Sequence, residues 1–191
     1  MANESLVRCG WADGDPLYEK YHDEEWGVPV HDDRVHFEFL ILEGAQAGLS
    51  WIAILKRRQG YTKAFADFDP AVVAEFDQSD YERLLADEGI IRNKLKIRSA
   101  VKNARAFLDI QEEFGSFDAY IWGFVDGTPV CNYPRVLEDV PATSELSDRV
   151  SKDLKKRGMS FVGSTIIYAH LQATGVVNDH VQTCFKSLTP T

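Results

Sequence analysis

Two cysteines and two histidines near opposite ends of the chain have the donor types and spacing of a metal site. Cys9 and His22 flank an aromatic segment near the start, and His180 and Cys184 lie four residues apart near the end. In a helix, that spacing places both side chains on one face. Two thiolates and two imidazoles complete the tetrahedral shell of Zn²⁺, so the site would be structural and would clasp the two ends together. The alternative is four ordinary core residues, because unpaired Cys and His are often buried.

A carboxylate within a long apolar run is the second group that could do chemistry. Glu43 lies inside residues 37–55, FEFLILEGAQAGLSWIAIL, whose only other charge, Glu38, is next to the start of the run. A segment that is apolar on all faces is buried, and a buried carboxylate needs hydrogen bonds or a positive partner. Gly44 and Gly48 could break the run into two helices with a pocket at the joint. Alternatively, Glu43 caps a neighbouring helix or bonds a core tyrosine.

Three adjacent pairs of histidine and aspartate suggest a different chemistry. The pairs are His22-Asp23, His31-Asp32 and Asp179-His180. A metal-dependent phosphohydrolase uses carboxylate and imidazole ligands and keeps one metal position open for water. Cys9 and Cys184 fit a closed site of soft ligands better.

Residues 84–97, LLADEGIIRNKLKI, have the order helix, glycine-containing hairpin and basic helix. Backbone N–H groups at such a turn bind phosphate, and Lys94, Lys96 and Arg98 add positive charge where a DNA backbone would lie. This is the pattern of a helix-hairpin-helix. The cations continue through Lys102 to Arg105, however, and such a stripe is also typical of a solvated helix face.

The elements that must position these residues are helices. Periodic apolar residues at 93–113 give the clearest helical signal. Ser79 and Glu82 resemble a capping box for the helix at 80–87. Capping and stop signals place helices at about 16–24, 31–55, 70–75, 80–87, 93–113, 117–125, 147–157 and 161–174, with a last short helix holding His180 and Cys184. No strand pattern or repeat stands out, so we expect an all-α protein.

Length and composition describe one globular domain, or two small lobes around a shared core. The chain has 191 residues, 45% of them hydrophobic, and its longest apolar run is interrupted too often to span a membrane. The start, MANESLVRCGW, lacks the layout of a secretory signal, and three cysteines are more typical of thiols or metal ligands than of disulfides, which favours the cytoplasm. A net charge of -9 argues mildly against a nucleic-acid partner, although the distribution of charge decides.

Six longer motifs run in a fixed order over nearly the whole chain. They are RCGW at 8–11, DPLYEKYHDEEWGVP at 15–29, LEGAQAGLSW at 42–51, GIIRNKLKI at 89–97, LKKRGMSFVGSTIIY at 154–168 and NDHVQTC at 178–184. Together they resemble the bacterial 3-methyladenine DNA glycosylase I family. The resemblance implies a helix-hairpin-helix glycosylase-like helical bundle in which a zinc site joins the N- and C-terminal segments. The single domain, 1–191, would have a helix-hairpin-helix lobe at about 36–125 and a zinc lobe from about 1–35 plus 126–191.

By this resemblance the protein is a base-excision repair enzyme. It would bind double-stranded DNA containing alkylated bases, flip out N3-methyladenine and release it by hydrolysis, leaving an abasic site without lyase activity. It would act as a monomer, with structural Zn²⁺ as its cofactor and no membrane partner. The family lacks the catalytic aspartate that most helix-hairpin-helix glycosylases carry after the hairpin, and residues 92–105 here contain no acidic residue.

The resemblance also assigns roles to residues of this chain. The zinc ligands would be Cys9, His22, His180 and Cys184. Glu43 would be the catalytic carboxylate. The substrate base would be bound by Glu43 and the aromatic residues Tyr18, Tyr21, Trp51, Trp11 and Trp26. Leu49 would enter the duplex, and DNA contacts would also come from Gly89, Arg92, Lys94 and Arg98.

Two rival functions share parts of this pattern. A non-catalytic reader of damaged DNA would have the same fold and pocket and would differ only in turnover. A phosphohydrolase would release phosphate and would lose activity on substitution of His31 or Asp32.

Overall fold

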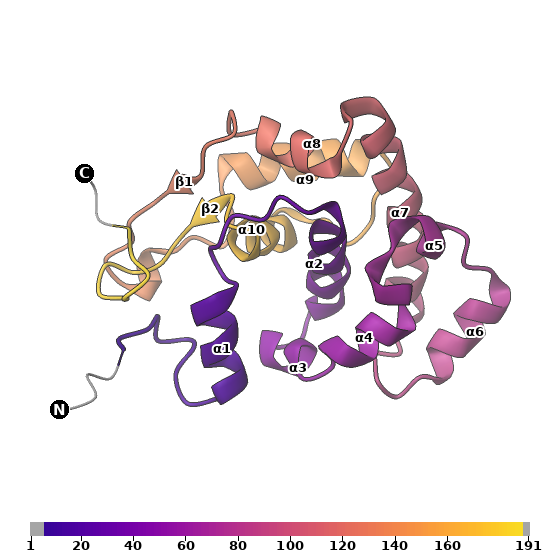
Figure 1. The fold of residues 1–191 in the computed structure, drawn as a ribbon, viewed down its shortest axis with the longest axis horizontal. Coiled ribbons are helices and arrows are strands. Elements are labelled where there is room, and N and C mark those ends of the chain that lie inside the picture. The colour runs from indigo at the N-terminus through magenta and orange to yellow at the C-terminus, as the bar shows by residue number, and fades with distance from the viewer. Residues whose placement is uncertain (1–5, 189–191) are drawn as a thin grey trace.

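The computed structural model describes residues 6–188 as a mainly helical protein (Figure 1). The helices are α1 (Pro16–Glu24), α2 (Asp33–Gln46), α3 (Trp51–Leu55), α4 (Arg58–Ala64), α5 (Pro70–Ala74), α6 (Gln78–Ala86), α7 (Lys94–Phe114), α8 (Phe117–Gly123), α9 (Glu145–Lys156) and α10 (Ser164–Ala173), with 3₁₀ turns η1 (Ala66–Phe68) and η2 (Leu137–Asp139). Two short strands, β1 (Val130–Cys131) and β2 (Val177–Asn178), pair in parallel. The all-α prediction is confirmed, and this strand pair is the one addition to it within the described residues.

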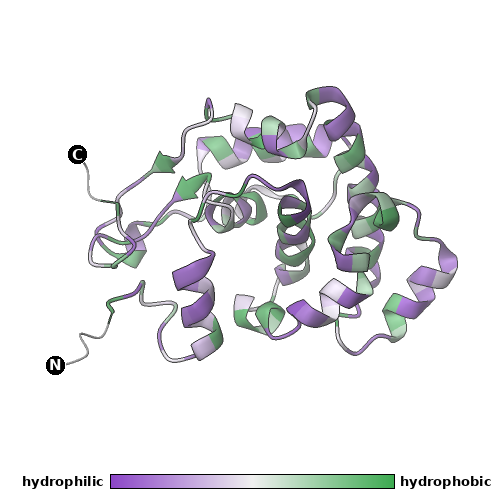
Figure 2. Ribbon diagram, in the orientation of Figure 1, coloured by the Kyte–Doolittle hydropathy of each residue, from purple (hydrophilic) through white to green (hydrophobic). Residues whose placement is uncertain are grey.

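Helix α2 is the buried centre of the fold, and α3, α7, α8 and α10 contact it. The Asp32 carboxylate begins the helix by accepting hydrogen bonds from the N–H groups of Arg34 and Val35. Nine of its fourteen residues are buried, Glu43 among them. Figure 2 shows the contrast between α2, largely in the hydrophobic colour, and the mostly hydrophilic α1. The helical conformation is interrupted between α2 and α3 next to Gly48, whose φ is 78°.

Helix α7 is the longest element and begins directly after the hairpin. The Asn93 side chain caps it by accepting hydrogen bonds from the N–H groups of Leu95 and Lys96. Its apolar face, predicted from the periodicity, is buried and packs against α5 and α2. The helix ends at Gly115, which has a φ of 87°.

The segments near the two ends of the chain lie together. The N–H group of Phe185 donates to the carbonyl oxygen of Val7 at 2.9 Å, and Lys186 Nζ donates to the carbonyl oxygen of Asp23 at 3.0 Å. The last helix predicted around His180 and Cys184 is wrong, because both residues lie in irregular chain after β2. The pairing of β2 with β1 holds the chain extended up to Asn178, so the chain enters this segment in an extended conformation.

Two further boundaries differ from the sequence prediction. Asp77 caps α6 in a capping box with Asp80, so the helix begins earlier than the predicted pair of Ser79 and Glu82 would place it. Asp77 accepts the hydrogen bond from the Ser79 N–H group, which makes that residue part of the first turn. Helix α4 carries no signal that the sequence analysis used. Among residues 6–188, no helix combines the length and apolar character needed to cross a bilayer.

Candidate functional site

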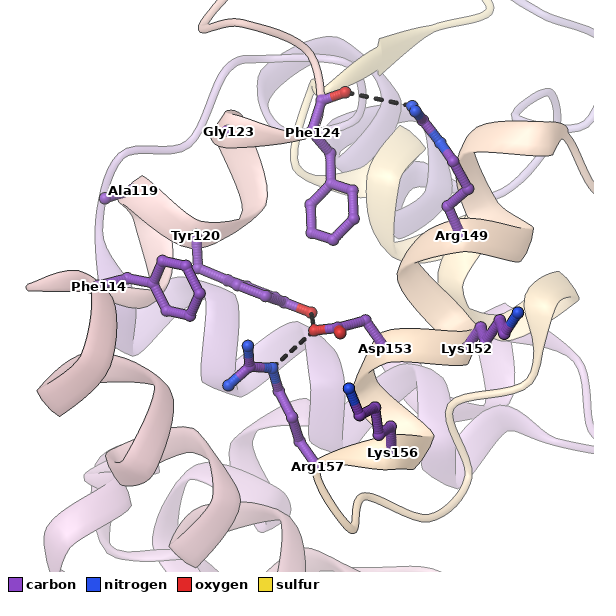
Figure 3. Close-up of a pocket in the computed structure, with 10 residues that line it drawn as sticks. All are labelled: Phe114, Ala119, Tyr120, Gly123, Phe124, Arg149, Lys152, Asp153, Lys156 and Arg157. Atoms are coloured by element: carbon purple, nitrogen blue, oxygen red, sulfur yellow. Dashed lines mark hydrogen bonds and ion pairs between the residues drawn. The ribbon is translucent and has the colours of Figure 1, made fainter.

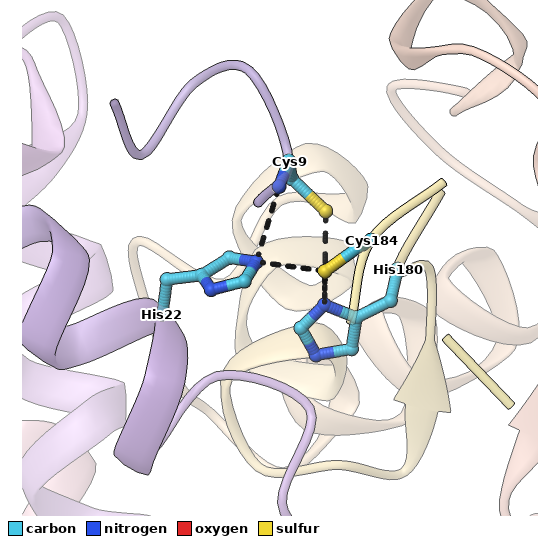
Figure 4. A group of neighbouring side chains, drawn as sticks. All are labelled: Cys9, His22, His180 and Cys184. Carbon is cyan, nitrogen blue, oxygen red and sulfur yellow. Dashed lines mark hydrogen bonds between the residues drawn. The ribbon is translucent and has the colours of Figure 1, made fainter. Parts of the chain in front are cut away.

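Cys9, His22, His180 and Cys184 form one buried cluster (Figure 4). Cys184 Sγ lies 3.4 Å from His22 Nε2 and 3.5 Å from His180 Nδ1. Cys9 Sγ lies 3.6 Å from His180 Nδ1. In a tetrahedral zinc site, with bonds of about 2.0–2.3 Å, neighbouring donor atoms stand roughly 3.3–3.8 Å apart. The cluster therefore has the dimensions of such a site.

The ring nitrogen that each histidine turns away from the cluster also has a partner. His22 Nδ1 lies 2.8 Å from Asp23 Oδ1, and His180 Nε2 lies 3.1 Å from the carbonyl oxygen of Trp26. Arg8 in turn donates to the Asp23 carboxylate at 2.7 Å. Acceptors of this kind fix the ring and the tautomer of metal-bound histidines. The contacts fit a set of metal ligands better than four unrelated core residues.

Burial sets the protonation of the cluster. It raises the pKa of Cys9 to about 12 and lowers the pKa of His180 to about 4. The neutral imidazole is the form that binds a metal, whereas the thiol must lose its proton. A divalent cation between the side chains would supply the positive charge that favours thiolates. These four residues are therefore the ones that could hold a metal ion.

A cavity of about 230 Å³ lies beside α1, the end of α2 and the start of α3. It brings together all five aromatic residues named by the resemblance, which are Trp11, Tyr18, Tyr21, Trp26 and Trp51. The rings hold one another in place. Trp11 packs edge-on against Tyr18 and Trp26, with ring centres 5.3 Å and 5.0 Å apart, and Tyr21 lies 5.4 Å from Trp51. We call this cavity the aromatic pocket.

Two polar atoms in the aromatic pocket have no hydrogen-bond partner among the described residues. Glu43 is 3% exposed and its Oε2 is unpaired, and so is Nε1 of Trp51. Leaving a buried polar atom unpaired costs about 1–3 kcal/mol. An unpaired acceptor and an unpaired donor on residues that line a cavity are expected where a ligand supplies the missing bonds. The hydrogen bond to a core tyrosine, which the sequence left open for Glu43, is not formed.

Burial alone raises the pKa of Glu43 to about 8. At neutral pH this carboxyl group is thus mostly protonated. A positive charge in the aromatic pocket would favour the ionised form, because it replaces part of the hydration that burial removes.

Two tryptophans connect the aromatic pocket with the Cys/His cluster. The ring of Trp26 packs edge-on against His180 at 4.6 Å, and the ring of Trp11 packs against His22 at 5.3 Å. Gly27 follows Trp26 with a φ of 76°, and a Cβ there would come within 2.9 Å of His180 Nε2. The cluster therefore shapes one wall of the pocket.

Lys96 ties the start of α7 to the end of α2. Its Nζ donates to the carbonyl oxygens of Ala45 and Ala47 at 2.7 Å and 2.6 Å. Helices leave their last carbonyl groups unpaired, and a cation there is favourable. The Lys96 ammonium group is thus bound to the end of α2, and its expected place beside a DNA backbone stays a prediction. It holds the loop at 47–50, in which Leu49 is 43% exposed.

Helix α4 packs directly against the hairpin at 87–93. The N–H group of Ile91 donates to the Tyr61 hydroxyl at 3.1 Å, and a Cβ at Gly60 would collide with the Gly89 carbonyl group. The Gly89 N–H group donates to Asp87 Oδ1 at 2.7 Å. The sequence analysis missed this support, although two glycines facing each other are a typical sign of close backbone approach.

The basic residues after the hairpin divide into two groups. Arg92 and Lys94 are exposed, and the Arg98 guanidinium lies 4.9 Å over the ring of Tyr81. Further along α7, Arg105 Nε donates to the carbonyl oxygen of Ala74, at 2.9 Å. The first part of the cationic stripe is therefore the part next to the hairpin, although Lys102 and Arg105 are exposed as well.

The three His/Asp pairs do not assemble an open metal site. His31 Nδ1 lies 2.9 Å from Asp118, while Asp32 caps α2. Asp179 accepts a hydrogen bond from the Tyr168 hydroxyl at 2.7 Å. Within residues 6–188, the Cys/His cluster is the group of donors with metal-ligand spacing. The phosphohydrolase alternative therefore has no site in the described residues.

The aromatic pocket also contains residues that the sequence analysis missed. They are Gln46, Leu137, Val140, Ala169 and Gln172. Gln46 follows Glu43 by three residues in α2, a spacing that places both on one helix face and could have identified it. Leu137 and Val140 come from the long connection between β1 and α9, where no local pattern indicates what the chain will contact.

Comparison with known proteins agrees with this geometry. The family model described as methyladenine glycosylase matches residues 11–187. The chain belongs to the methyladenine glycosylase family. It is 49% identical to DNA-3-methyladenine glycosylase 1 of Escherichia coli (strain K12), over 94% of this chain and 96% of that protein.

Solved structures of methyladenine glycosylases have the same fold. The crystal structure of a 3-methyladenine DNA glycosylase I (TAG) matches with a TM-score of 0.92 at 48% identity, covering 95% of this chain and 100% of that one. A variant of such an enzyme in complex with 3-methyladenine also has a TM-score of 0.92, at 33% identity, covering 96% and 99%. The resemblance inferred from the six motifs is confirmed.

Proposed function

We propose that this chain is a DNA-3-methyladenine glycosylase, which flips N3-methyladenine out of alkylated double-stranded DNA and releases it by hydrolysis. Membership of the methyladenine glycosylase family supports the activity. The observation that carries the proposal for the site is the unpaired Glu43 carboxyl group in an aromatic pocket. Action as a monomer in the cytoplasm belongs to the same proposal.

The aromatic pocket would hold the extruded base by stacking and by charge. Methylation at N3 makes adenine cationic, and a cation is attracted to the faces of Tyr and Trp rings. Stacking contributes about 1–3 kcal/mol per base, while extraction from the duplex costs a few kcal/mol. The wall formed by Trp11, Tyr18, Tyr21, Trp26 and Trp51 therefore favours a base that is both planar and positively charged.

Glu43 would select the charged base through its own ionisation. Its pKa of about 8 means that the empty pocket holds a neutral carboxyl group at pH 7. Entry of a cationic base would release the proton, and the carboxylate would then pair with the charge and accept a hydrogen bond from the adenine amino group. A neutral adenine cannot offset the cost of a buried carboxylate. This coupling favours the damaged base over the normal one.

Bond breaking then needs little further help. The bond between the sugar C1′ and the base nitrogen N9 breaks, its electron pair neutralises the positive charge of the base, and water adds to C1′ and loses a proton. Because the leaving group departs neutral, no strong acid is required. The absence of acidic residues at 92–105 is consistent with this chemistry.

The DNA backbone would be held on the side of the hairpin. Leu49 would fill the space left in the duplex, while Gly89, Arg92, Lys94 and Arg98 would approach the phosphates. The hydrogen bonds from Lys96 to the end of α2 keep these two DNA-facing segments next to each other. We place Zn²⁺ in the Cys/His cluster as a structural ion, which when bound would brace the pocket wall through Trp11 and Trp26.

The activity can be tested with DNA treated with a methylating agent. Purified protein is incubated with this DNA, and the soluble fraction is analysed by chromatography for free bases and for inorganic phosphate. We expect 3-methyladenine to be released while the strands keep abasic sites. Tight binding to the damaged DNA without base release would instead identify a non-catalytic reader, and release of phosphate would identify a phosphohydrolase.

A further inference from the structure

A second and larger groove lies between α8 and α9, at the far end of α7 from the hairpin (Figure 3). Its volume is about 600 Å³, compared with about 230 Å³ for the aromatic pocket. Helix α7 has 21 residues and so spans roughly 30 Å. The hairpin precedes its first residue and Phe114, its last, lines the groove. The groove is therefore remote from the segments proposed to face DNA.

The floor of the groove is aromatic. The buried Tyr120 ring packs edge-on against Phe114 and against Phe124, with ring centres 5.1 Å and 5.2 Å apart. Phe114 is 42% exposed. On α8 the small residues Ala119 and Gly123 leave space, and a Cβ at Gly123 would meet no atom within 4 Å. A bulky apolar side chain from outside could thus reach the rings without moving the backbone.

One wall of the groove is cationic. Arg149, Lys152 and Lys156 follow one another along one face of α9 at the spacing i, i+3 and i+7, and all three are exposed. None of them forms an ion pair with residues 6–188, in a chain with a net charge of -9. Figure 3 shows Lys152 and Lys156 separate from the central ion pair. Exposed cations without an ion-pair partner beside an apolar floor attract an acidic ligand.

The centre of the groove is held rigid by its own ion pairs. Arg157 donates to Asp153 and to Glu113, at 2.6 Å each, and the Tyr120 hydroxyl donates to Asp153 at 2.9 Å. The Arg157 guanidinium also lies 4.9 Å from the ring centre of Phe114. The groove is therefore preformed, which lowers the entropy cost of binding.

We propose that this groove binds a short acidic helix of a partner protein, which places one bulky apolar side chain on the aromatic floor and a row of carboxylates along α9. Amphipathic helices bind in this way to apolar grooves. The cations at 149, 152 and 156 cover two helical turns, which matches carboxylates at the same spacing on a docked helix. A single nucleic-acid strand fits less well, because the rings already pack edge to face on one another and the carboxylates of Asp153 and Glu113 would repel phosphates.

The test begins with selection of binders from a displayed library of random peptides on the intact protein. We expect the enriched peptides to combine Asp or Glu with Phe, Leu or Trp. A synthetic peptide of the enriched sequence is then labelled, and its dissociation constant is measured by fluorescence anisotropy. Lys156→Glu should weaken binding about tenfold, and the affinity of the wild type should fall as salt is added.

Lys155→Glu is the matched control. Lys155 is the neighbouring exposed residue of α9, lies outside the groove lining and changes the net charge equally. It should leave the dissociation constant within about twofold of the wild type. Gly123→Leu should abolish binding by filling the groove. Both groove variants should keep wild-type melting temperatures and wild-type release of 3-methyladenine, which separates this surface from base excision.

Several results would overturn the proposal. One is enrichment of peptides without acidic residues, and another is equal loss of affinity in Lys155→Glu and Lys156→Glu. Binding of a single-stranded oligonucleotide that competes with the peptide and is lost in Lys156→Glu would assign the groove to nucleic acid. Self-association that Gly123→Leu abolishes, measured by sedimentation, would assign it to a second copy of this chain.

Discussion

The Cys/His cluster and the aromatic pocket share a wall, but the polar atoms of the cluster have partners whereas two polar atoms of the pocket have none. In the cluster, the four potential metal-ligand atoms lie close to one another, and both outward ring nitrogens have hydrogen-bond acceptors. In the pocket, Glu43 Oε2 and Trp51 Nε1 have no partner. A completed set of contacts is typical of a site that supports the fold, whereas unpaired atoms are typical of a site that waits for a ligand. Burial alone does not distinguish the two regions.

An unpaired buried atom indicates a ligand site only where it faces a cavity. His36 and His170 are fully buried and their ring nitrogens also lack hydrogen-bond partners. Neither of them lines the aromatic pocket. Burial lowers the pKa of both, so each remains neutral inside the core. The aromatic pocket is distinguished by an open volume lined by two residues, Glu43 and Trp51, that carry an unpaired acceptor and an unpaired donor.

The largest effect should come from removing a cluster ligand. Cys184→Ser should lower the free energy of unfolding by about 4 kcal/mol or more, because loss of a structural metal also loosens the wall formed by Trp26. The measurements are urea denaturation and metal analysis, which should find about one zinc per wild-type chain. Cys131→Ser, at a half-buried thiol outside the cluster, is the control and should change neither. Unchanged stability and no zinc in the wild type would remove the structural role of the cluster.

In the pocket, substitution should have the opposite effect on stability. Glu43→Gln should reduce release of 3-methyladenine about a hundredfold, or roughly 2.7 kcal/mol, while raising the melting temperature. The amide removes a buried ionisable group but cannot pair with a cationic base. Glu38→Gln in the same helix removes the negative charge that pairs with Arg58 at 2.6 Å, and should lower stability while retaining base release. Wild-type activity in Glu43→Gln would refute the assigned role.

Lys96 tests whether the pocket and the hairpin act together. Lys96→Met removes two charged hydrogen bonds to the end of α2, each worth about 1.5–3 kcal/mol, and should reduce base release from DNA about tenfold. Binding of free 3-methyladenine should change less, because the ring wall remains. Lys102→Met is the control. Lys102 lies on the same helix as Lys96 and forms a single hydrogen bond, of 3.4 Å, to Ser160. Equal activity of the two variants would argue against a positioning role.

The protonation of Glu43 should appear in the pH profile. With a pKa of about 8, the ionised fraction of the free enzyme, and hence kcat/KM, should rise about tenfold from pH 7 to pH 9. The stability of the fold should fall over the same pH range. Because the pKa of Glu43 is raised from about 4.5 in the unfolded chain to about 8 in the folded one, its contribution to stability is complete below pH 4.5 and is lost as the pH rises through about 8. Glu43→Gln should remove both trends, and a flat wild-type profile would contradict the proposed ionisation.

The smallest effect should come from single cations beside the hairpin. Lys94→Glu should weaken duplex binding and reduce the slope of log affinity against log salt by roughly 0.9, the value for one phosphate contact. Lys155→Glu, which changes the charge of the remote helix α9, should leave that slope unchanged. Equal behaviour of the two variants would return the stripe at 94–105 to an ordinary solvated helix face.

The sequence predicts those parts of the fold and site that depend on local signals. The periodic apolar residues at 93–113 predict α7, and of the two glycines Gly48 lies at the predicted break, whereas Gly44 lies inside α2. The family motifs group Glu43 with five aromatic residues that line the same cavity, and all six positions lie within one N-terminal segment.

Long-range contacts account for what the sequence could not predict. Lys96 has the same local pattern as Lys94, and only the approach of α2 turns one inward and leaves the other exposed. The turns around His180 depend on pairing between β1 and β2, which are separated by α9 and α10. Leu137 reaches the pocket through a connection without regular periodicity.

The clasp between Cys9 and Cys184 has a consequence for synthesis of the protein. Ribosomes release the N-terminal residues first, so α1, α2 and α3 emerge long before the turns that carry His180 and Cys184. Until residue 180 has left the exit tunnel, Trp26 lacks the His180 ring against which it packs. A nascent chain can therefore form its central helices early but cannot complete the base-binding wall, which keeps partly made or truncated chains from extracting bases.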